Sequence, residues 1–558
     1  MRTVVGWFFV TVGAACLLAG AAVAALLGPD DRARSDPQPL DTRSSVLVTA
    51  AGLLSWSGPT VQVEATLPDD RPVFVGLGNE VDVSDYSRRV DALVVEAIEL
   101  PFVLDAVEVD AGRSRPVSPD RLDWWLASVQ GDGAATLGVQ LPSAPSQLVV
   151  AALDRGDLRG LEVTAAYELD GGFGVGVGVA VLGVGLVLFG VITRRRRPDD
   201  GGRRRRRRDN DPVIGDAGSA QPGQGSSGRS PAPGHRAVRL AEGVVAGLAL
   251  VGLTAGCTVP LPVDEQPVKT AVAQDDADEV VARWAERRAE AVRTLDPAPL
   301  AEVEAGATLA VEEGALAVAR RLITPGSQET DQDLRLRRVV APRLSSYPLW
   351  FIAVVDDGQR ELAKVQVYRR AQAAGPWQLV STTEVLPSTQ LPDVALDDTG
   401  AFEPVDPADA KGLPAAPQEI ADGYAALLDD LEARGDELVL VDSFVEQMRA
   451  VATNLDSLDG VRLRQSWRAQ PVRWVARTSD GGALVFATMA RDDRYRITSG
   501  TAAAWPEGSA QSAFLAGRGD TSAVLRFRHQ VLLYVPPTGG GQARALGQYG
   551  GVVSTTGR

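Results

Sequence analysis

The sequence predicts a multi-domain membrane protein with transmembrane helices, a β-sandwich-like exterior domain, and two α+β units whose helices lie on a curved antiparallel sheet. Three observations predict this class. Two long apolar runs occupy residues 4–27 and 173–193, short alternating strands fill the segment between them, and an order of helices followed by strands occurs twice after residue 275. A chain of 558 residues with 45% hydrophobic content has room for several domains, each with its own core.

Both apolar runs are long enough to cross a bilayer. Arg2 precedes the run at 4–27, and we expect an uncleaved span there, with a cleaved signal peptide as the alternative. The run at 173–193 is followed at once by the arginines 194–197, which favour the cytoplasmic side. We therefore expect residues 29–171 to lie outside the cell.

The second apolar run contains a possible helix-packing motif. Gly174 and Gly178 form a G-x-x-x-G step, which could let two helices approach closely. We expect chance spacing in this run, which is rich in Gly and Val, with a packing role as the alternative.

The segment 194–238 combines arginine runs with Asp, Gly, Ser and Pro and has no hydrophobic period, which predicts a flexible cytoplasmic linker. Its arginines either fix the topology or bind anionic lipid headgroups. Because no aromatic residues alternate with them, we expect no nucleic-acid partner.

An internal signal follows the linker. A short apolar run at 244–255 ends in Thr254-Ala255-Gly256-Cys257, which resembles the lipobox of bacterial lipoproteins. The resemblance implies that Cys257 takes a lipid and that membrane lipid is a partner. The alternative is a third span at 240–259. Either way residues 258–558 should lie outside, and the two routes differ in whether the halves stay covalently joined.

The segment 45–170 alternates in the manner of short strands. We expect one helix at 84–97 and strands at 61–66, 72–78, 122–128, 135–140, 148–153 and 161–167. Trp124 and Trp125 are candidates for a binding platform. Because adjacent strand residues face opposite ways, we expect one of them in the core and the other exposed.

Residues 45–193 resemble a family of uncharacterised actinobacterial two-span membrane proteins. The matching features are Pro-Val-Phe-Val-Gly-Leu-Gly at 72–78, Val-Asp-Val-Ser-Asp-Tyr at 81–86, Trp-Trp-Leu-Ala-Ser at 124–128, and the span that follows. The resemblance implies a location and a fold but no reaction.

The C-terminal half predicts two α+β units, NTF2-like or cystatin-like. Helices are expected at 276–293, 307–322, 417–433 and 443–453, and strands at 334–341, 349–355, 363–370, 377–385, 461–468, 472–478, 483–491, 524–535 and 543–554. The half is similar to an uncharacterised actinobacterial lipoprotein family in its lipobox, its Trp284 helix, Leu349-Trp350-Phe351, and Gly-Pro-Trp-Gln-Leu-Val at 375–380. We expect Trp377 in the core.

The sequence lacks the common motifs of catalysis. It has no G-x-S-x-G elbow and no phosphate-binding loop. Its two cysteines, Cys16 and Cys257, lie in apolar segments, so a disulfide is not expected, and with only His235 and His529 a metal centre is not expected either. No cofactor is expected.

Two carboxylate pairs and one histidine are the weak candidates for chemistry. We expect Asp429/Asp430 on an acidic helix face and Asp492/Asp493 in a turn. We expect His529, flanked by arginines on an alternating strand, to be exposed.

These features favour a non-enzymatic cell-envelope protein whose exterior domains bind an envelope protein or a cell-wall component. The alternative is a carboxylate-dependent enzyme that acts on cell-wall or secreted substrates. A third possibility is that residues 1–235 and 258–558 are two proteins that assemble.

The predicted boundaries are 1–28 for the first span or signal anchor, 29–171 for the exterior β-rich domain, 172–193 for the second span, 194–238 for the basic linker, 239–257 for the internal signal or third span, 258–275 for a tether, 276–392 for the first α+β unit, 393–416 for a linker and 417–558 for the second unit.

Overall fold

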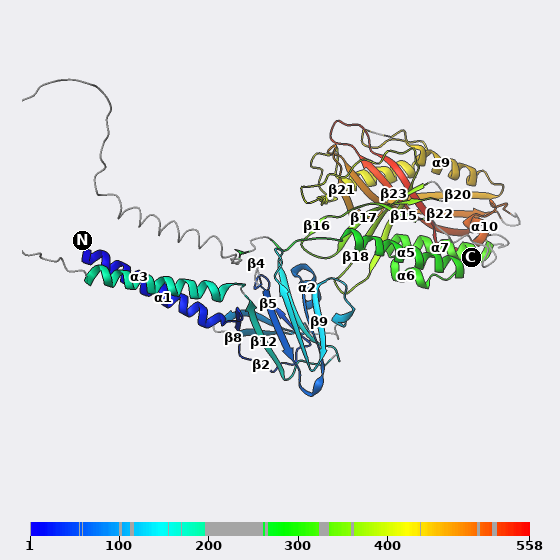
Figure 1. Cartoon of the computed structure of the whole chain (residues 1–558). Coiled ribbons are helices and arrows are strands. Elements are labelled where there is room, and N and C mark those ends of the chain that lie inside the picture. Colours follow the sequence, from blue (N-terminus) through cyan, green and yellow to red (C-terminus); the bar gives the residue numbers. More distant parts are fainter. Residues whose placement is uncertain are drawn as a thin grey trace, which may run out of the picture.

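The computed structural model describes residues 2–195 and 261–557, with short internal gaps at 55, 58–59, 100–102, 112–116, 155, 169, 263–265, 323–333, 359–361, 436, 499–502 and 516–521. The internal signal with Cys257 and the basic linker beyond residue 195 lie outside the described residues. The described part contains two long apolar helices, several β-sheets and further helices, so the multi-domain prediction is confirmed at that level (Figure 1).

The two long helices are α1 (Arg2–Leu27) and α3 (Gly172–Arg195), and both are long and apolar enough to cross a membrane. Figure 1 shows them side by side. They run antiparallel, because Gly20 meets Gly176 near one end of the pair and Gly6 meets Gly190 near the other. Between these contacts, a Cβ atom on Gly13 would lie 2.8 Å from the carbonyl oxygen of Gly183.

The glycines that allow this close approach recur every seven residues in both helices, at 6, 13 and 20 and at 176, 183 and 190. A seven-residue repeat keeps side chains on one stripe of a helix. Gly174 and Gly178 take no part in this packing, as expected for chance spacing: added Cβ atoms there would meet nothing within 4 Å. The same helix therefore packs through glycine, but along a different face.

Between the two long helices lies a β-rich part, residues 28–171, here called the β-unit. One sheet holds β1 (Arg32–Arg34), β2 (Gln38–Leu40), β5 (Thr60–Thr66), β10 (Ala134–Gln140) and β12 (Leu161–Glu168). A second sheet, in the order β8-β7-β3-β11-β6-β9, holds β3 (Val46–Thr49), β6 (Pro72–Asn79), β7 (Ala92–Glu99), β8 (Val103–Val109), β9 (Trp125–Asp132) and β11 (Ser146–Ala152). Alternate residues of both sheets, such as Val63 and Val75, share one core.

Short helical segments complete the β-unit. They are η1 (Pro68–Asp70), η2 (Pro119–Arg121) and α2 (Glu80–Ser87). The expected helix at 84–97 is wrong beyond Ser87, because its second part is strand β7, which pairs in parallel with β3. The run Ala-Leu-Val-Val at 92–95 is rich in β-branched residues, which favour a strand.

The C-terminal unit, residues 261–557, is built on one nine-stranded antiparallel sheet in the order β15-β17-β18-β19-β24-β23-β22-β20, with β21 paired to β22. Its strands are β15 (Leu334–Val340), β17 (Leu349–Asp357), β18 (Leu362–Arg370), β19 (Trp377–Val385), β20 (Val461–Ala469), β21 (Trp474–Arg477), β22 (Ala483–Ile497), β23 (Ser522–Val535) and β24 (Arg544–Gly557). In the sheet, the halves expected as separate units are joined by the pair Glu384–Gln548, between β19 and β24, and residues of both halves, such as Val367 and Leu532, share one core.

Helices cover this sheet. They are α5 (Gln274–Thr294), α6 (Ala298–Val303), α7 (Gly306–Leu322), α8 (Pro417–Asp429), α9 (Ser443–Asp456) and α10 (Ala510–Leu515). Two short strand pairs flank the unit: β13 (Leu261–Pro262) pairs with β4 (Trp56–Ser57) of the β-unit, and β14 (Lys269–Thr270) pairs with β16 (Arg343–Leu344). Helix α5 buries Val281 and Trp284 against Phe351 and Leu379 of the sheet.

Candidate binding cleft between the β-unit and the C-terminal unit

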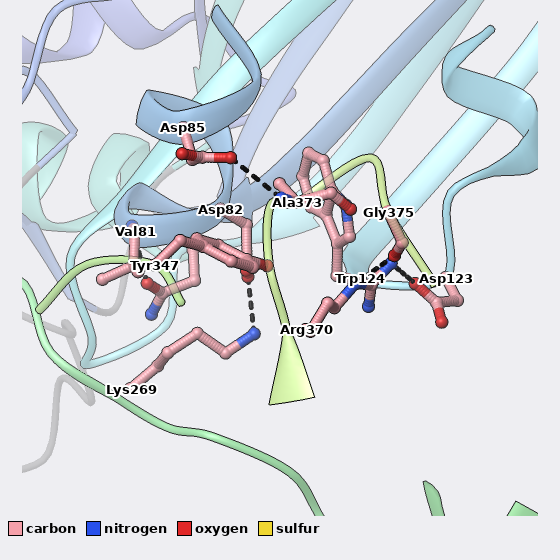
Figure 2. Close-up of polar contacts among 11 residues, drawn as sticks. Val81, Asp82, Asp85, Asp123, Trp124, Lys269, Tyr347, Arg370, Ala373 and Gly375 are labelled. Carbon is pink, nitrogen blue, oxygen red and sulfur yellow. Dashed lines mark hydrogen bonds and ion pairs between the residues drawn. The ribbon is translucent and has the colours of Figure 1, made fainter. Parts of the chain in front are cut away.

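Helix α2 of the β-unit presents a buried carboxylate to the C-terminal unit. Asn79 starts this helix by accepting a hydrogen bond from the Val81 N–H. Asp82, which is 0% exposed, accepts hydrogen bonds of 2.6 Å from the Lys269 Nζ and from the Tyr347 hydroxyl (Figure 2). Burial and the neighbouring Asp82 raise the pKa of Tyr347 far above its usual range, so the phenol stays a donor.

A second carboxylate on the same helix holds the turn between β18 and β19. Asp85 accepts a 2.8 Å hydrogen bond from the Ala373 N–H, and the Trp124 indole donates to the Ala373 carbonyl at 3.0 Å. Arg370 donates to Asp123 of the β-unit at 2.6 Å and to the Gly375 carbonyl at 2.9 Å (Figure 2). Asp85 and Trp124 of the β-unit therefore bind the turn directly, and Asp123 binds it through Arg370.

The interface is one wall of a cavity of about 980 Å³. Both units line it: Trp124, Trp125 and Leu126 come from the β-unit, and Trp284 and Trp377 from the C-terminal unit. Leu126 is 54% exposed, so the cleft has an open apolar rim. Its charged side chains carry both signs, namely Asp123, Lys269, Asp276, Glu279, Arg283 and Arg370.

The two adjacent tryptophans lie against each other. Their ring centroids are 4.1 Å apart, so the expected opposite facing is wrong. Trp124 comes before β9 begins, and the alternation of a strand therefore does not apply to it. Trp124 is buried, while Trp125 is half-buried and donates to the Pro119 carbonyl at 2.8 Å. Trp377, expected in the core, is half-buried at the cleft.

Behind the Trp284 wall lies a buried pair of carboxyl groups. The Trp284 indole donates to Glu304 at 2.8 Å, and Glu304 is 1% exposed. Burial and then the neighbouring Glu312 raise the pKa of Glu304. Glu312 accepts hydrogen bonds from Arg288 at 3.1 Å and from the Tyr549 hydroxyl at 2.5 Å. The hydrogen-bond partners of these two carboxyl groups lie on α5 and β24.

The residues expected as chemical candidates do not meet in this cleft. Asp429 ends α8 and accepts from the Trp467 N–H at 2.6 Å, and the neighbouring Asp430 caps that end of the helix; both are exposed. Asp492 and Asp493 do not form a turn: both lie inside β22, on opposite faces, and both are buried. Arg491 pairs with Asp493 at 3.1 Å.

The expectation that His529 is exposed is also wrong. The ring is 7% exposed and lies among Phe444, Trp467 and Phe527. Burial, and then the charge of Arg491, lower the pKa of His529 well below its usual value. Neither ring nitrogen has a hydrogen-bond partner in the structure. Within the residues that the structure describes, no group of three or more His, Cys, Asp or Glu residues could hold a metal ion.

Sequence reasoning missed Asp82, Asp85, Asp123 and Arg370. Their partners come from the other unit, and no local pattern shows such a pairing. The available signal was a pair of aspartates three residues apart in a short helix among apolar residues. Buried carboxylates need partners, so this pair could have indicated a contact with another part of the chain.

No curated protein and no solved structure matches the chain significantly. One family matches residues 268–557, slightly more than half of the chain, and its description is "Domain of unknown function (DUF8094)". The matched segment contains both halves of the nine-stranded sheet and the C-terminal wall of the cleft. The chain therefore belongs to the DUF8094 family.

Proposed function

We propose that this protein is a membrane-anchored binding protein of the cell envelope, and that the cleft between the β-unit and the C-terminal unit holds its ligand. The observation that carries the proposal is a cavity of about 980 Å³ lined by aromatic and charged side chains from both parts. A concave site with aromatic walls and a few polar groups is the usual form of a ligand site. We also propose that the β-unit is a β-sandwich and that the C-terminal unit consists of two α+β units joined edge to edge.

The proposed topology has the N-terminus inside and both exterior parts outside. Supporting it, α1 and α3 are antiparallel, so residue 195 lies at the opposite end of the pair from the β-unit. Leu261, by contrast, pairs with Ser57 in the β-unit. The chain then recrosses the membrane between these points, and the apolar segment 240–259 has the length for it.

The internal signal gives this topology two forms. Either the segment 240–259 remains as a span, or it is cleaved and Cys257 carries the lipid anchor. In the second form the β-unit and the C-terminal unit are separate chains that the polar interface around Asp82 and Asp85 holds together.

The cleft walls indicate the class of ligand. Trp125 and Trp377 offer flat apolar faces, which suit the apolar faces of sugar rings or of peptide side chains. Arg283 can bind a carboxylate, and Asp276 and Glu279 can accept hydrogen bonds. A cell-wall fragment that carries both sugar and peptide groups fits this mixture.

Calorimetric titration of the full chain in detergent micelles tests the proposal, with three probes: a disaccharide-peptide from peptidoglycan, the disaccharide alone, and the peptide alone. We expect saturable binding of at least one probe, weakened at least tenfold by Trp377→Ala. Trp505→Phe is the matched control, because Trp505 packs on Tyr495, outside the cleft lining. Absence of binding by all three probes, or equal binding by the Trp377→Ala variant with an unchanged melting temperature, would contradict the proposal.

The enzyme alternative has one observation in its favour, the raised pKa of Glu304 behind the cleft wall. A carboxyl group that stays protonated near neutral pH can act as a general acid. The same titrations, followed for product formation, separate the two functions. The binding proposal expects no turnover, whereas turnover that Glu304→Gln abolishes while binding persists would favour the enzyme.

A further inference from the structure

Seven arginines share one face of the sheet formed by β20, β22 and β23. Cross-strand partners in an antiparallel sheet point to the same side. The register places Arg462 opposite Arg496, Arg464 opposite Arg494, and Arg468 opposite Ala490, whose other neighbour is Arg528. The arginine face consists of Arg462, Arg464, Arg468, Arg494, Arg496, Arg526 and Arg528.

One carboxylate lies among these side chains on the described strands. Asp492 stands opposite Arg526 and forms an ion pair of 3.4 Å with Arg494. It is 5% exposed, and its Oδ1 atom has no hydrogen-bond partner in the structure. Burial, and then the charge of Arg468, lower the pKa of Arg528 against the opposing effect of Asp492.

The arginines of this face are exposed or half-buried, and few of them form ion pairs with the residues that the structure describes. The face's arginines on β20 and β22 are exposed, and its two arginines on β23 are half-buried. Within the part of the chain that the structure describes, Arg494 is the one member of the face with an ion pair to a carboxylate. Directly opposed like charges, such as Arg464 and Arg494, destabilise a sheet. A protein with a net charge of −16 therefore keeps a concentrated positive patch at a cost to its stability.

We propose that the arginine face binds a linear phosphodiester polymer of the cell envelope. Arginine forms paired hydrogen bonds with phosphate oxygens, and a row of arginines suits a chain of phosphates better than a single anion. Side chains two apart on a strand are spaced by roughly 6.6 Å. That spacing matches phosphates joined by short polyol bridges.

Two rival partners fit the geometry less well. In the view of Figure 1, β20 and β22 lie on the side of the C-terminal unit that is remote from α1 and α3, so the anchoring membrane is distant from the face. A second copy would have to offer a row of carboxylates; the start of α5, with Asp275, Asp276 and Asp278, could do so. The polymer is favoured because its charge repeats along the whole face.

Fluorescence anisotropy with labelled linear poly(glycerol phosphate) and the full chain in detergent tests this inference. We expect binding that weakens steeply with added salt, because phosphate contacts release counterions. Arg464→Gln/Arg494→Gln/Arg526→Gln should weaken it at least tenfold and flatten the salt dependence. The control is Arg293→Gln/Arg337→Gln/Arg434→Gln, which removes the same charge from exposed arginines elsewhere and should leave binding unchanged.

Three results would overturn the inference. Equal weakening by both triple variants would reduce the effect to net charge. Binding to phosphatidylglycerol vesicles without binding to the polymer would assign the face to a membrane. A dimer, seen by sedimentation, that the first triple variant dissolves would assign it to a second copy. Because these variants lie outside the cleft, failure here leaves the cleft proposal standing, and the reverse also holds.

Discussion

At the scale of single residues, the alternation of β23 explains both the arginine face and the buried histidine. Arg526 and Arg528 point to one side of the strand, and Phe527 and His529 point to the other. The sequence shows this alternation but not which face is covered. Helix α9 places Phe444 over His529, and that contact depends on packing between residues far apart in the chain.

The lowered pKa of His529 predicts a pH dependence of stability. Below the usual histidine pKa of about 6.5, the unfolded chain binds a proton that the folded ring does not, so stability falls as the pH falls. The loss should approach about 1.4 kcal/mol per pH unit below that value until the folded ring is itself protonated. His529→Phe and His529→Gln should both remove it.

Thermal melts of the full chain between pH 7.5 and pH 5 check this prediction. The quantity to compare is the difference between each variant and the wild type, because the raised pKa of Glu304 also makes stability depend on pH in this range. Wild-type and variant curves that run parallel with pH would show that His529 is protonated in the folded state as readily as in the unfolded one.

At the scale of elements, the glycine stripe between α1 and α3 cannot be recognised from the sequence of either helix alone. The G-x-x-x-G step in α3 is visible locally, yet it faces away from α1. The seven-residue repeat becomes meaningful only when the matching repeat in α1 is laid beside it. The mistaken helix at 84–97 has a similar cause, since the parallel partner of β7 is β3, far away in the sequence.

The stripe predicts different responses to equal substitutions in α3. Gly183→Ala should destabilise the helix pair, by about 1–3 kcal/mol, because its Cβ atom would lie 2.4 Å from the backbone nitrogen of Leu17. Gly185→Ala, two residues away, meets nothing within 4 Å and should be neutral or slightly stabilising, because alanine favours helix. Melting of both variants in detergent, followed by circular dichroism, measures the contrast. Equal melting temperatures would show that the two helices do not pack in this way.

At the scale of the whole molecule, sequence patterns locate the apolar helices and most strands but not their assembly. Strands such as β19 begin and end where the pattern predicts. The union of the two expected units depends on the pairing of Glu384 with Gln548 and on a core shared by both halves, and no local pattern encodes either contact. The cleft was beyond prediction for the same reason, because its walls come from segments as distant as Trp125 and Trp377.

In the proposed topology, the β-unit and the C-terminal unit contact each other outside the cell. Asp123 and Gly375 share Arg370 across the interface, and the exposed Pro376 follows Gly375 in the cleft lining (Figure 2). Asp123→Cys and Pro376→Cys therefore place two thiols at one site if the parts are assembled as described. Asp123→Cys with Asn454→Cys on α9 is the control pair, since Asn454 is exposed and outside the cleft lining.

The most direct measurement is cross-linking of these pairs on intact cells with a short, membrane-impermeant bismaleimide, in a chain with Cys16→Ser. The account predicts a cross-link for the Asp123/Pro376 pair and none for the control pair. If the chain is cut at the internal signal, the product joins two fragments on a denaturing gel; if not, it is one chain of altered mobility. Cross-linking only after the cells are permeabilised, or no cross-link although both cysteines react with a monofunctional maleimide, would contradict the account.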